Sequence, residues 1–548
     1  MTGVINLIRL PLLIFFLLAC NPTGGKDQAN QPATIRSEDE VFYLIFPRSF
    51  SDSNGDEIGD LNGVTEKLDY LQQLGVTSII MTPLYPSIYY HNYFTDNFAG
   101  IDEEFGSMDD YLHMVREIHR RGMKFYMDTE VQYATKEHPW FKESFQNPSS
   151  QYDDYVFYND SLNQDPSTIV FGVKGLTSYD GSYLDITTVN LYNPAVRKYM
   201  VDLYAYWVDP NGDGTFDDGV DGFRLDHTMD DLDGKGLLKN MLTDFWKPLI
   251  DQVKAQNPAV KFIAEQSEWD KPFWEDPGYG FFSKAGVDIV YSFGHWYGMS
   301  DRGQFAKAIE VENEGTPAGK HFFLFLDMHD TDRFGSTPGW SVARNKQKAA
   351  MVYLSKGIPL IYYGQELGMK GTRLPDSVDT GIPQPHDGSD VPRREAFEWS
   401  RDINSDGMAT WYKDAQPYWD HRLNHSNDGI SVEEEDTDIH SLLNYYRSLF
   451  RFRAANKAFY SGEIQVIPTQ NDSVLAYCRW DEESKFLLVF NFRPENADAE
   501  ILSSSLPFEV GVGKWAKVLG DDQSTFKVQE GIVRVSLVNN GFLVLQVR

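Results

Sequence analysis

Three acidic residues lie at the ends of short apolar runs that read as β-strands, and a carboxyl group in such a position is suited to nucleophilic or acid–base chemistry. They are Asp226 in GFRLD, Glu265 in FIAEQ and Asp330 in FLDMHD. The carboxyl ends of the strands of a parallel barrel open into one cavity, where residues far apart in the chain meet. The sequence therefore predicts one site that contains all three acids.

Paired carboxyl groups are what the cleavage of a glycosidic bond requires. A retaining glycosidase holds a nucleophilic carboxylate and a proton-donating carboxylic acid roughly 5 Å apart. Arg224 lies two residues before Asp226, on the same face of a strand, where its guanidinium would keep Asp226 ionised. Glu265, expected to lie further from this cation, would keep a raised pKa and act as acid and then as base. Taken alone, Arg224 and Asp226 also fit an ordinary charged strand end.

The elements that must position these acids alternate between short apolar runs and amphipathic helical stripes. One stripe runs over residues 111–118 behind a capping box of Ser107 and Asp110, and another runs over residues 196–207 after Asn193-Pro194. The strand candidates are residues 41–47, 78–83, 123–128, 219–226, 261–266, 287–293, 322–327 and 358–364. Eight strands with helical spacers predict an α/β fold, a (β/α)8 barrel.

Changes in composition along the chain predict its domains. More than sixty irregular, polar and aromatic residues follow the third strand candidate, which indicates an inserted subdomain. The β-rich end of the chain fits an antiparallel β-sandwich. We expect a lipoprotein signal peptide at residues 1–20, a flexible tether at 21–40, the catalytic barrel at 41–128 and 191–457, the inserted subdomain at 129–190 and the C-terminal sandwich at 458–548.

The N-terminus has the shape of an export signal. Its apolar run is too short for a spanning helix, and Leu17-Leu18-Ala19-Cys20 resembles the bacterial lipobox, in which the cysteine is lipidated. We therefore expect a lipid-anchored protein of the cell envelope, on the outer membrane or the cell surface; a plain secretory signal is the alternative. Cys478 then has no partner for an intramolecular disulfide and is expected to be a buried small hydrophobe.

The charge of the chain excludes some classes of partner. A formal net charge of −32, from 49 basic and 81 acidic side chains, disfavours contact with nucleic acid and with anionic membranes. The substrate is then neutral, or the acids hold cations, although an acidic surface that only aids solubility explains much of the excess. Membrane contact is expected only through the lipid anchor.

One acidic loop has the donors of a calcium site. The run DSNGDEIGD places side-chain oxygens at alternating positions, at Asp52, Asn54, Asp56 and Asp60. Oxygen-only donors with this spacing suit calcium, so we predict calcium as a cofactor, with a hydrated acidic turn as the alternative. The similar run at residues 209–218 lacks a well-placed final glutamate, and an ordinary turn is favoured there.

Long segments of the chain resemble the α-amylase family, glycoside hydrolase family 13. They include VFYLIFPRSFSDSNGDEIGDLNGV, EFGSMDDYLHMVREIHRRGMKFYMD, GVDGFRLD, MHDTDRF, IPLIYYGQELGM and DVPRREAFEW. The resemblance implies Asp226 as nucleophile, Glu265 as acid/base and Asp330 as the carboxylate that grips sugar hydroxyls and stabilises the transition state.

The resemblance also implies supporting residues. Arg224 and His329 take the family's supporting roles, and Asp128 closes the third strand in the first signature block. In the calcium loop, the family also uses the backbone carbonyl at the position of Ile58. Tyr93 is expected to act as a stacking platform for a sugar.

Several positions depart from the family pattern. Gln132 and Tyr133 stand where the family usually has Asn-His, so the histidine that touches the sugar is missing; Tyr133 would still stack or donate one hydrogen bond. Phe94 follows Tyr93 where an aspartate is usual. The other altered positions are Met229, Asp230 and Met328. These changes bear on the sugar-binding groups and leave the three acids intact.

The predicted function is that of a retaining glycoside hydrolase. It would cleave α-glucosidic bonds, mainly α-1,4, in starch-like glucans or maltooligosaccharides. An exo-acting α-glucosidase or an α-glucan transglycosylase on the same scaffold is the first alternative, and a non-catalytic surface glucan-binding protein is the second. Other components of glucan uptake are expected partners.

Overall fold

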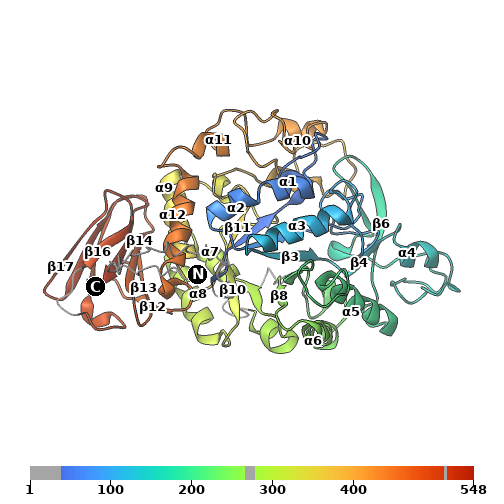
Figure 1. Cartoon of the computed structure of the whole chain (residues 1–548), viewed down its shortest axis with the longest axis horizontal. Helices are drawn as coiled ribbons and strands as arrows, with labels where there is room; N and C mark the ends of the chain where they lie inside the picture. The colour runs from blue at the N-terminus through green and yellow to red at the C-terminus, as the bar shows by residue number, and fades with distance from the viewer. Residues whose placement is uncertain (1–38, 266–277, 511–514, 548) are drawn as a thin grey trace, which may run out of the picture. The chain divides into compact units, whose positions relative to one another are not determined.

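A computed structural model of the chain describes residues 39–265, 278–510 and 515–547 (Figure 1). The predicted signal peptide, its Cys20 and the tether up to residue 38 lie outside these residues. Within the described residues, no helix combines the length and the apolar character that crossing a membrane requires.

Eight parallel strands close into a barrel, in the order β1-β11-β10-β9-β8-β7-β3-β2. Their bounds are β1 Phe42–Ile45, β2 Ser78–Met81, β3 Lys124–Thr129, β7 Gly222–Leu225, β8 Lys261–Ala264, β9 Ile289–Tyr291, β10 His321–Leu324 and β11 Ile358–Tyr362. Nearly every barrel residue is buried, as expected where side chains fill the interior and helices cover the outside. The predicted (β/α)8 barrel is confirmed.

Helices connect the strands around the barrel, and α10, α11 and α12 follow its last strand, β11. Their bounds are α1 Leu61–Glu66, α2 Leu68–Leu74, α3 Met108–Arg120, α5 Pro194–Val208, α6 Lys247–Gln256, α7 Phe293–Gly298, α8 Arg302–Gly315, α9 Val342–Tyr353, α10 Gln416–Asp420, α11 Val432–Glu435 and α12 Leu442–Ala454. The predicted capping box is present on α3, where Ser107 and Asp110 exchange hydrogen bonds. The apolar stripes predicted on α3 and α5 are buried, because these faces pack against the barrel.

A small antiparallel sheet lies between β3 and α5 in the chain. Its strands β4 Tyr133–Thr135, β6 Tyr183–Thr188 and β5 Gly175–Thr177 pair in that order, and α4 Pro139–Ser144 follows β4. Because it leaves the barrel at the carboxyl end of β3, this segment reaches the end of the barrel where the strands' carboxyl termini lie.

The C-terminal strands form two antiparallel sheets, β12-β13-β14-β19-β16 and β15-β18-β17. Their bounds are β12 Glu463–Ile467, β13 Val474–Trp480, β14 Lys485–Asn491, β15 Ala497–Leu502, β16 Trp515–Gly520, β17 Thr525–Gln529, β18 Ile532–Leu537 and β19 Phe542–Val547. Side chains from both sheets share one apolar cluster, as in a β-sandwich. Cys478 on β13 is free and buried in that cluster, as predicted.

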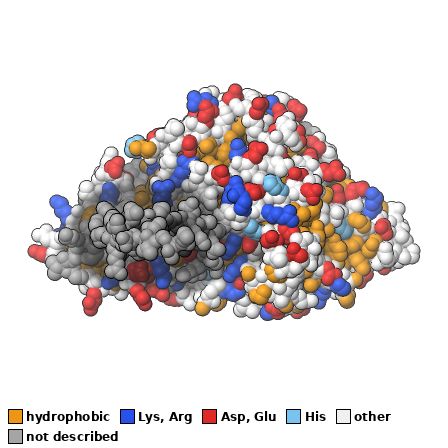
Figure 2. Space-filling view, in the orientation of Figure 1, with side chains coloured by type: hydrophobic (Ala, Val, Ile, Leu, Met, Phe, Trp, Pro, Cys, Tyr) orange, Lys and Arg blue, Asp and Glu red, His pale blue; other side chains and the backbone are white. Residues whose placement is uncertain are grey.

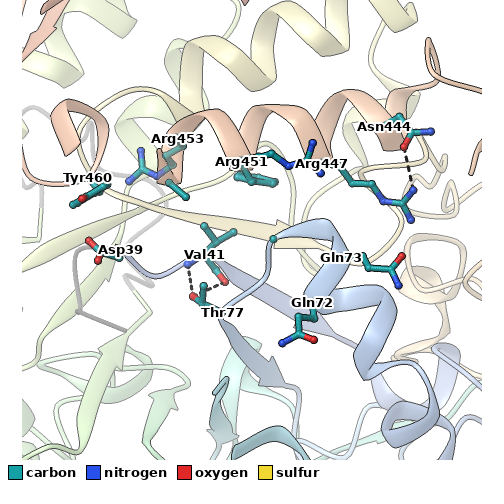
Figure 3. Close-up of a pocket in the computed structure, with 13 residues that line it drawn as sticks. Asp39, Val41, Gln72, Gln73, Thr77, Asn444, Arg447, Arg451, Arg453 and Tyr460 are labelled. Carbon is teal, nitrogen blue, oxygen red and sulfur yellow. Dashed lines mark hydrogen bonds between the residues drawn. The ribbon is translucent and has the colours of Figure 1, made fainter. Parts of the chain in front are cut away.

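The amino-terminal end of the barrel carries a hollow of about 550 Å³ beside β1 and β2 (Figure 3). Arginines on α12 line it, but the buried Arg453 donates to the carbonyl oxygens of Tyr353 at 2.8 Å and Gly357 at 2.7 Å. This arginine therefore ties α12 to the segment between α9 and β11. Residues at the amino-terminal end of such a barrel typically contribute to stability rather than to catalysis, and the contacts of Arg453 are of this kind.

Candidate active site

The three predicted acids line one cavity of about 560 Å³ at the carboxyl ends of the barrel strands. Asp226 directly follows β7 and Glu265 directly follows β8, and these strands are paired with Leu225 opposite Ala264. Asp330 lies six residues beyond the end of β10. Tyr93 lines the same cavity. The structure thus brings together residues that are separated by more than one hundred positions in the chain.

Arg224, on β7, contacts three carboxylates with one fully buried guanidinium. Nη1 lies 3.0 Å from Asp128 Oδ1 and also contacts Asp226 Oδ1, while Nη2 lies 3.1 Å from Glu265 Oε2. Glu265 is thus further from this cation than Asp226, as expected, yet it still contacts the guanidinium. The planar guanidinium presents several N–H groups in one fork, so it serves the acids of neighbouring strands together.

The two acids that face Arg224 from β7 and β8 differ in protonation. Burial alone would raise the pKa of Asp226, but the adjacent Arg224 guanidinium lowers it to about 2. Burial raises the pKa of Glu265 well above its ordinary value despite Arg224, and the charge of Asp226 raises it further. One site therefore holds an ionised carboxylate beside a protonated carboxylic acid.

Asp330 is held by two cationic neighbours. Its Oδ2 lies 2.8 Å from His329 Nε2, and its Oδ1 lies 3.1 Å from Arg394 Nη2. Burial opposes ionisation of this carboxyl, but His329 and Arg394 hold its pKa below the usual range. Arg394 lies in DVPRREAFEW, far from Asp330 in the chain, and sequence reasoning gave it no role because no local pattern links the two.

Tyr93 joins the cavity wall to the residues behind it. Its hydroxyl donates to Asp128 Oδ2 at 2.7 Å and lies 2.8 Å from His329 Nε2, and its ring stacks on that of His329 with centroids 5.8 Å apart. Asp128, His329 and Arg224 are buried behind the lining. Burial raises the pKa of Asp128 to about 7. Of the predicted substrate-binding residues, Tyr93 therefore has direct access to the cavity.

Gln132 and Tyr133, the altered residues of the first signature block, form hydrogen bonds within the protein. The side-chain amide of Gln132 donates to the backbone oxygens of Asp226 at 2.6 Å and His227 at 3.1 Å. Tyr133 is fully buried, and its hydroxyl donates to Asp233 Oδ1 at 2.6 Å. Its one donor is thus already used, and the structure does not bring it to the cavity lining. Asp230 pairs with Lys284 Nζ at 2.8 Å, outside the cavity.

Two further residues beside Asp226 escaped sequence reasoning. Glu130 directly follows β3, His227 directly follows Asp226, and both line the cavity. Within the described residues, Glu130, Asp226 and His227 are the one group of three whose acidic or imidazole ligand atoms lie within 4.8 Å of one another. Glu130 is two residues beyond Asp128, at the end of the same strand, and this position in the sequence could have identified it as a residue of the site.

The inserted segment and residues 384–390 together form one wall of the cavity. Residues 384–390, here called the strap, bind β5: Thr177 N donates to Pro385 O at 2.9 Å, and Asp387 N donates to Thr177 O at 3.1 Å. Phe171 lines the cavity beside this closure, with its side chain 93% exposed and a φ of 61°. An exposed aromatic ring in this position is suited to packing on the apolar face of a sugar.

The cavity adjoins another at Asp330. This residue also lines a second hollow of about 610 Å³, whose wall includes Trp296 and Arg393. A bound chain would therefore meet the strap at one end and extend past Asp330 at the other.

The predicted calcium loop offers oxygen donors without a cationic side chain. Asp52 accepts backbone N–H groups of residues 54, 55 and 57, Asn54 accepts that of Asp56, and Asp56 accepts that of Ile58. Asp60 accepts from Ser53 and Gly63. Among the described residues, no Lys, Arg or His forms an ion pair with Asp52, Asp56 or Asp60; the neighbouring pair is Lys413–Glu57. These donors fit a hard divalent cation such as calcium.

The loop at residues 209–218 is held by its own side chains. Asp209 and Asp213 accept backbone N–H groups within the loop, and Arg116 lies 3.4 Å from Asp218. This is the turn that the sequence favours.

Most of the chain is similar to known proteins. The family model described as "Alpha amylase, catalytic domain" matches residues 44–462, and "Alpha amylase, C-terminal all-beta domain" matches residues 467–548. The chain is 29% identical to Alpha-amylase 3 of Dictyoglomus thermophilum, over 84% of this chain and 88% of that protein. It is 27% identical to Probable oligo-1,6-glucosidase 2 of Bacillus subtilis, over 84% and 91% respectively. The structure resembles that of an alpha-amylase from H. orenii with a TM-score of 0.73 at 26% identity, covering 93% of this chain and 99% of the other.

Proposed function

Because this chain belongs to the alpha-amylase family and is a glycoside hydrolase, we propose that its three converging acids cleave α-glucosidic bonds with retention of configuration. The observation that carries the proposal is the shared contact of Asp226 and Glu265 with Arg224, which leaves one acid ionised and the other protonated. A retaining double displacement needs that combination at one place.

The first step forms a glycosyl-enzyme intermediate. An Asp226 carboxylate oxygen attacks the anomeric carbon, the bond from that carbon to the leaving oxygen breaks, and the Glu265 carboxyl transfers its proton to that oxygen. In the second step, Glu265 takes a proton from water, whose oxygen attacks the same carbon and displaces Asp226. Retention follows because the carbon is inverted twice.

The neighbouring groups hold the sugar for this reaction. Asp330, kept ionised by His329 and Arg394, accepts sugar hydroxyls and stabilises the positive charge of the transition state. Tyr93 packs its ring against the sugar and is held in place by Asp128 and His329. Arg224 and Asp128 act from behind the cavity wall.

The proposed substrates are starch-like α-glucans or maltooligosaccharides with mainly α-1,4 bonds. The relative in Dictyoglomus thermophilum is named an alpha-amylase, which supports this choice. The neutral substrate also suits a chain with a net charge of −32, because it meets no repulsion from the acidic surface. On the face in Figure 2, acidic and basic side chains are interspersed.

A second candidate is an exo-acting α-glucosidase or transglycosylase that takes short chains. The strap favours it, because a cavity closed on one side receives a chain end rather than the middle of a polymer. The relative in Bacillus subtilis is named a probable oligo-1,6-glucosidase, so α-1,6 bonds are a second linkage to be tested.

We further propose a calcium site at the loop of Asp52, Asn54, Asp56 and Asp60, with the carbonyl of Ile58 as an added donor. When bound, the ion would neutralise the loop's carboxylates and stabilise the fold near β1. It takes no part in the steps above.

The lipid anchor at Cys20 and the position at the cell envelope are proposals too. They are supported by the lipobox-like sequence, and glucan-uptake components would be the expected neighbours there. Labelling of cells with an alkyne-tagged palmitate tests the anchor: the wild-type protein is labelled and Cys20→Ser is not.

Incubation with amylose, pullulan, dextran, trehalose and maltooligosaccharides tests the function, with products followed over time and the first anomer formed read by NMR. We expect retained α-anomers, and a loss of about 10⁴-fold or more in turnover for Asp226→Asn, which still binds glucan. Asp327→Asn is the matched control: Asp327 is also buried after β10 but lies outside the cavity lining. Near-normal turnover in Asp226→Asn would refute the nucleophile.

A further inference from the structure

Nδ1 of His227, a buried polar atom beside Asp226, lacks a hydrogen-bond partner among the described residues, and Oε2 of Glu130 has none other than the Asp226 carboxyl. Glu130 is 1% exposed, and its other carboxyl oxygen accepts the backbone N–H of Gln132 at 2.5 Å. Buried polar groups in native proteins nearly always have partners, so the unpaired Nδ1, which faces Oε2 of Glu130, indicates the position of an external group.

The spacing of these atoms fits one hydroxyl group between them. His227 Nδ1 lies 3.8 Å from Glu130 Oε2 and 4.0 Å from Asp226 Oδ2, which is too long for direct hydrogen bonds. An oxygen atom about 2.8 Å from both Nδ1 and Oε2 would span their 3.8 Å separation at an angle of about 85°. A hydroxyl can accept from one neighbour and donate to the other, so it satisfies both.

The backbone is arranged to hold His227 at this place. His227 has a φ of 41°, a left-handed conformation that is rare for a residue other than glycine. Its carbonyl oxygen accepts from Gln132 Nε2 at 3.1 Å and from Met229 N at 2.7 Å. Strained conformations persist where the surroundings fix them, and they cluster at functional sites. Glu130 is fixed from the adjacent strand, since β3 pairs with β7.

Resting on the function proposed above, we propose that Glu130 and His227 bind one hydroxyl group of the glycosyl unit that Asp226 attacks. Both side chains line the cavity that contains the three acids, and His227 directly follows Asp226 in the chain. The pair thus selects sugars that carry this hydroxyl in the correct orientation. A sugar without it leaves Nδ1 of His227 unpaired, which is a strong basis for rejection.

A divalent transition-metal ion is the other occupant that these groups would suit, since an imidazole and two carboxylates lie within 4.8 Å. Two observations favour the hydroxyl. Asp226 is already paired with Arg224. Burial and the charge of Asp226 raise the pKa of Glu130, which favours its protonated form, whereas metal ligands must be deprotonated.

Four substrates that each lack one hydroxyl test the proposal: the 2-, 3-, 4- and 6-deoxy analogues of 4-nitrophenyl α-D-glucopyranoside. For the wild type, removal of the bound hydroxyl should lower kcat/KM by about tenfold to a hundredfold. In His227→Ala and in Glu130→Met, that one penalty should disappear while the other three penalties stay. If both variants keep all four penalties, the proposal is wrong.

Controls separate the possible failures. His138→Ala removes a histidine that is more deeply buried than His227 and lies outside the cavity, and it should keep every penalty. Unfolding midpoints show whether each variant is folded, and His227→Gln replaces His227→Ala if that variant unfolds. Loss of wild-type activity with 1,10-phenanthroline under excess calcium, restored by Zn²⁺, would overturn the proposal in favour of a metal. If Asp226→Asn is fully active, the proposed function itself fails, whereas unchanged penalties with inactive Asp226→Asn reject only the hydroxyl site.

Discussion

Arg224 holds Asp128, Asp226 and Glu265 with one guanidinium, yet only Asp226 has its pKa lowered. The reason is a competition between burial, which favours the neutral form of each acid, and the attraction of the cation. The cation prevails at Asp226, and burial prevails at Glu265. An ion pair that gains little stability in the interior is thus explained by the reaction it prepares.

The pH dependence of kcat/KM should follow from these two acids. In the proposed mechanism the active form has Asp226 ionised and Glu265 protonated, so activity should fall as pH drops through about 2 and as pH rises through the pKa of Glu265. The second limb should lie well above pH 4.5, the ordinary glutamate value. Initial rates on maltose, measured from acid to alkaline pH, check both limbs.

Glu265→Gln should remove the alkaline limb, because the titrating group is gone. It should lower the rate on maltose by about 10²–10⁴-fold, and the rate on 4-nitrophenyl α-glucoside by less, since that leaving group needs no proton. Glu398→Gln is the matched control: burial also raises the pKa of Glu398, to about 9, but it lies outside the cavity lining. An unchanged alkaline limb in Glu265→Gln would show that another group is the acid.

At the scale of elements, we expect the strap to determine which part of a substrate reaches the acids. It joins β5 of the inserted segment to the connection between β11 and α12 through two backbone hydrogen bonds at Thr177. Tyr90 and His91 support it: the Tyr90 hydroxyl donates to Asp387 O at 3.3 Å, and His91 Nε2 lies 3.3 Å from Asp387 Oδ2. The closure is therefore shared by three separate segments of the chain.

Thr177→Pro should open this closure. Proline cannot donate the hydrogen bond to Pro385 O, and the loss of about 1 kcal/mol raises the population of the open strap roughly fivefold. We expect the ratio of amylose to maltose hydrolysis to rise by a similar factor. Thr177→Ala keeps the backbone donor and should keep the wild-type ratio. If the wild type and both variants have the same ratio, the strap does not determine the preferred chain length.

At the scale of the whole molecule, an excess of 32 negative charges works against a compact fold, because like charges repel. A bound divalent cation offsets part of this repulsion where carboxylates are concentrated. The loop of residues 52–60 directly precedes α1, and Asp60 caps that helix by accepting the N–H of Gly63. Calcium there would thus stabilise the whole barrel.

Removal of calcium should lower the unfolding temperature. An ion present at 100 times its Kd stabilises a fold by about 2.7 kcal/mol, which corresponds to several degrees. Calorimetry with EDTA and with added calcium measures the difference. Asp56→Asn should abolish the response to calcium, whereas Asp213→Asn, in the loop at residues 209–218, should retain it. Equal responses in both variants would place the ion elsewhere.

Local patterns in the sequence were sufficient for the barrel and its acids. Apolar runs and helical stripes depend on neighbouring residues, so the eight strands and the α3 capping box were readable one segment at a time. Asp226 and Glu265 could be assigned because each directly follows a strand, and barrel geometry then implies that they meet.

Only the tertiary structure decided which other groups join them. Arg394 reaches Asp330, Glu130 faces His227, and the strap meets Thr177, each across many intervening residues. Such contacts follow from the pairing of distant segments, which leaves no periodic trace in the sequence. Protonation was decided there as well: burial and the position of Arg224 set the pKa of Glu265, and neither can be read from its neighbours in the chain.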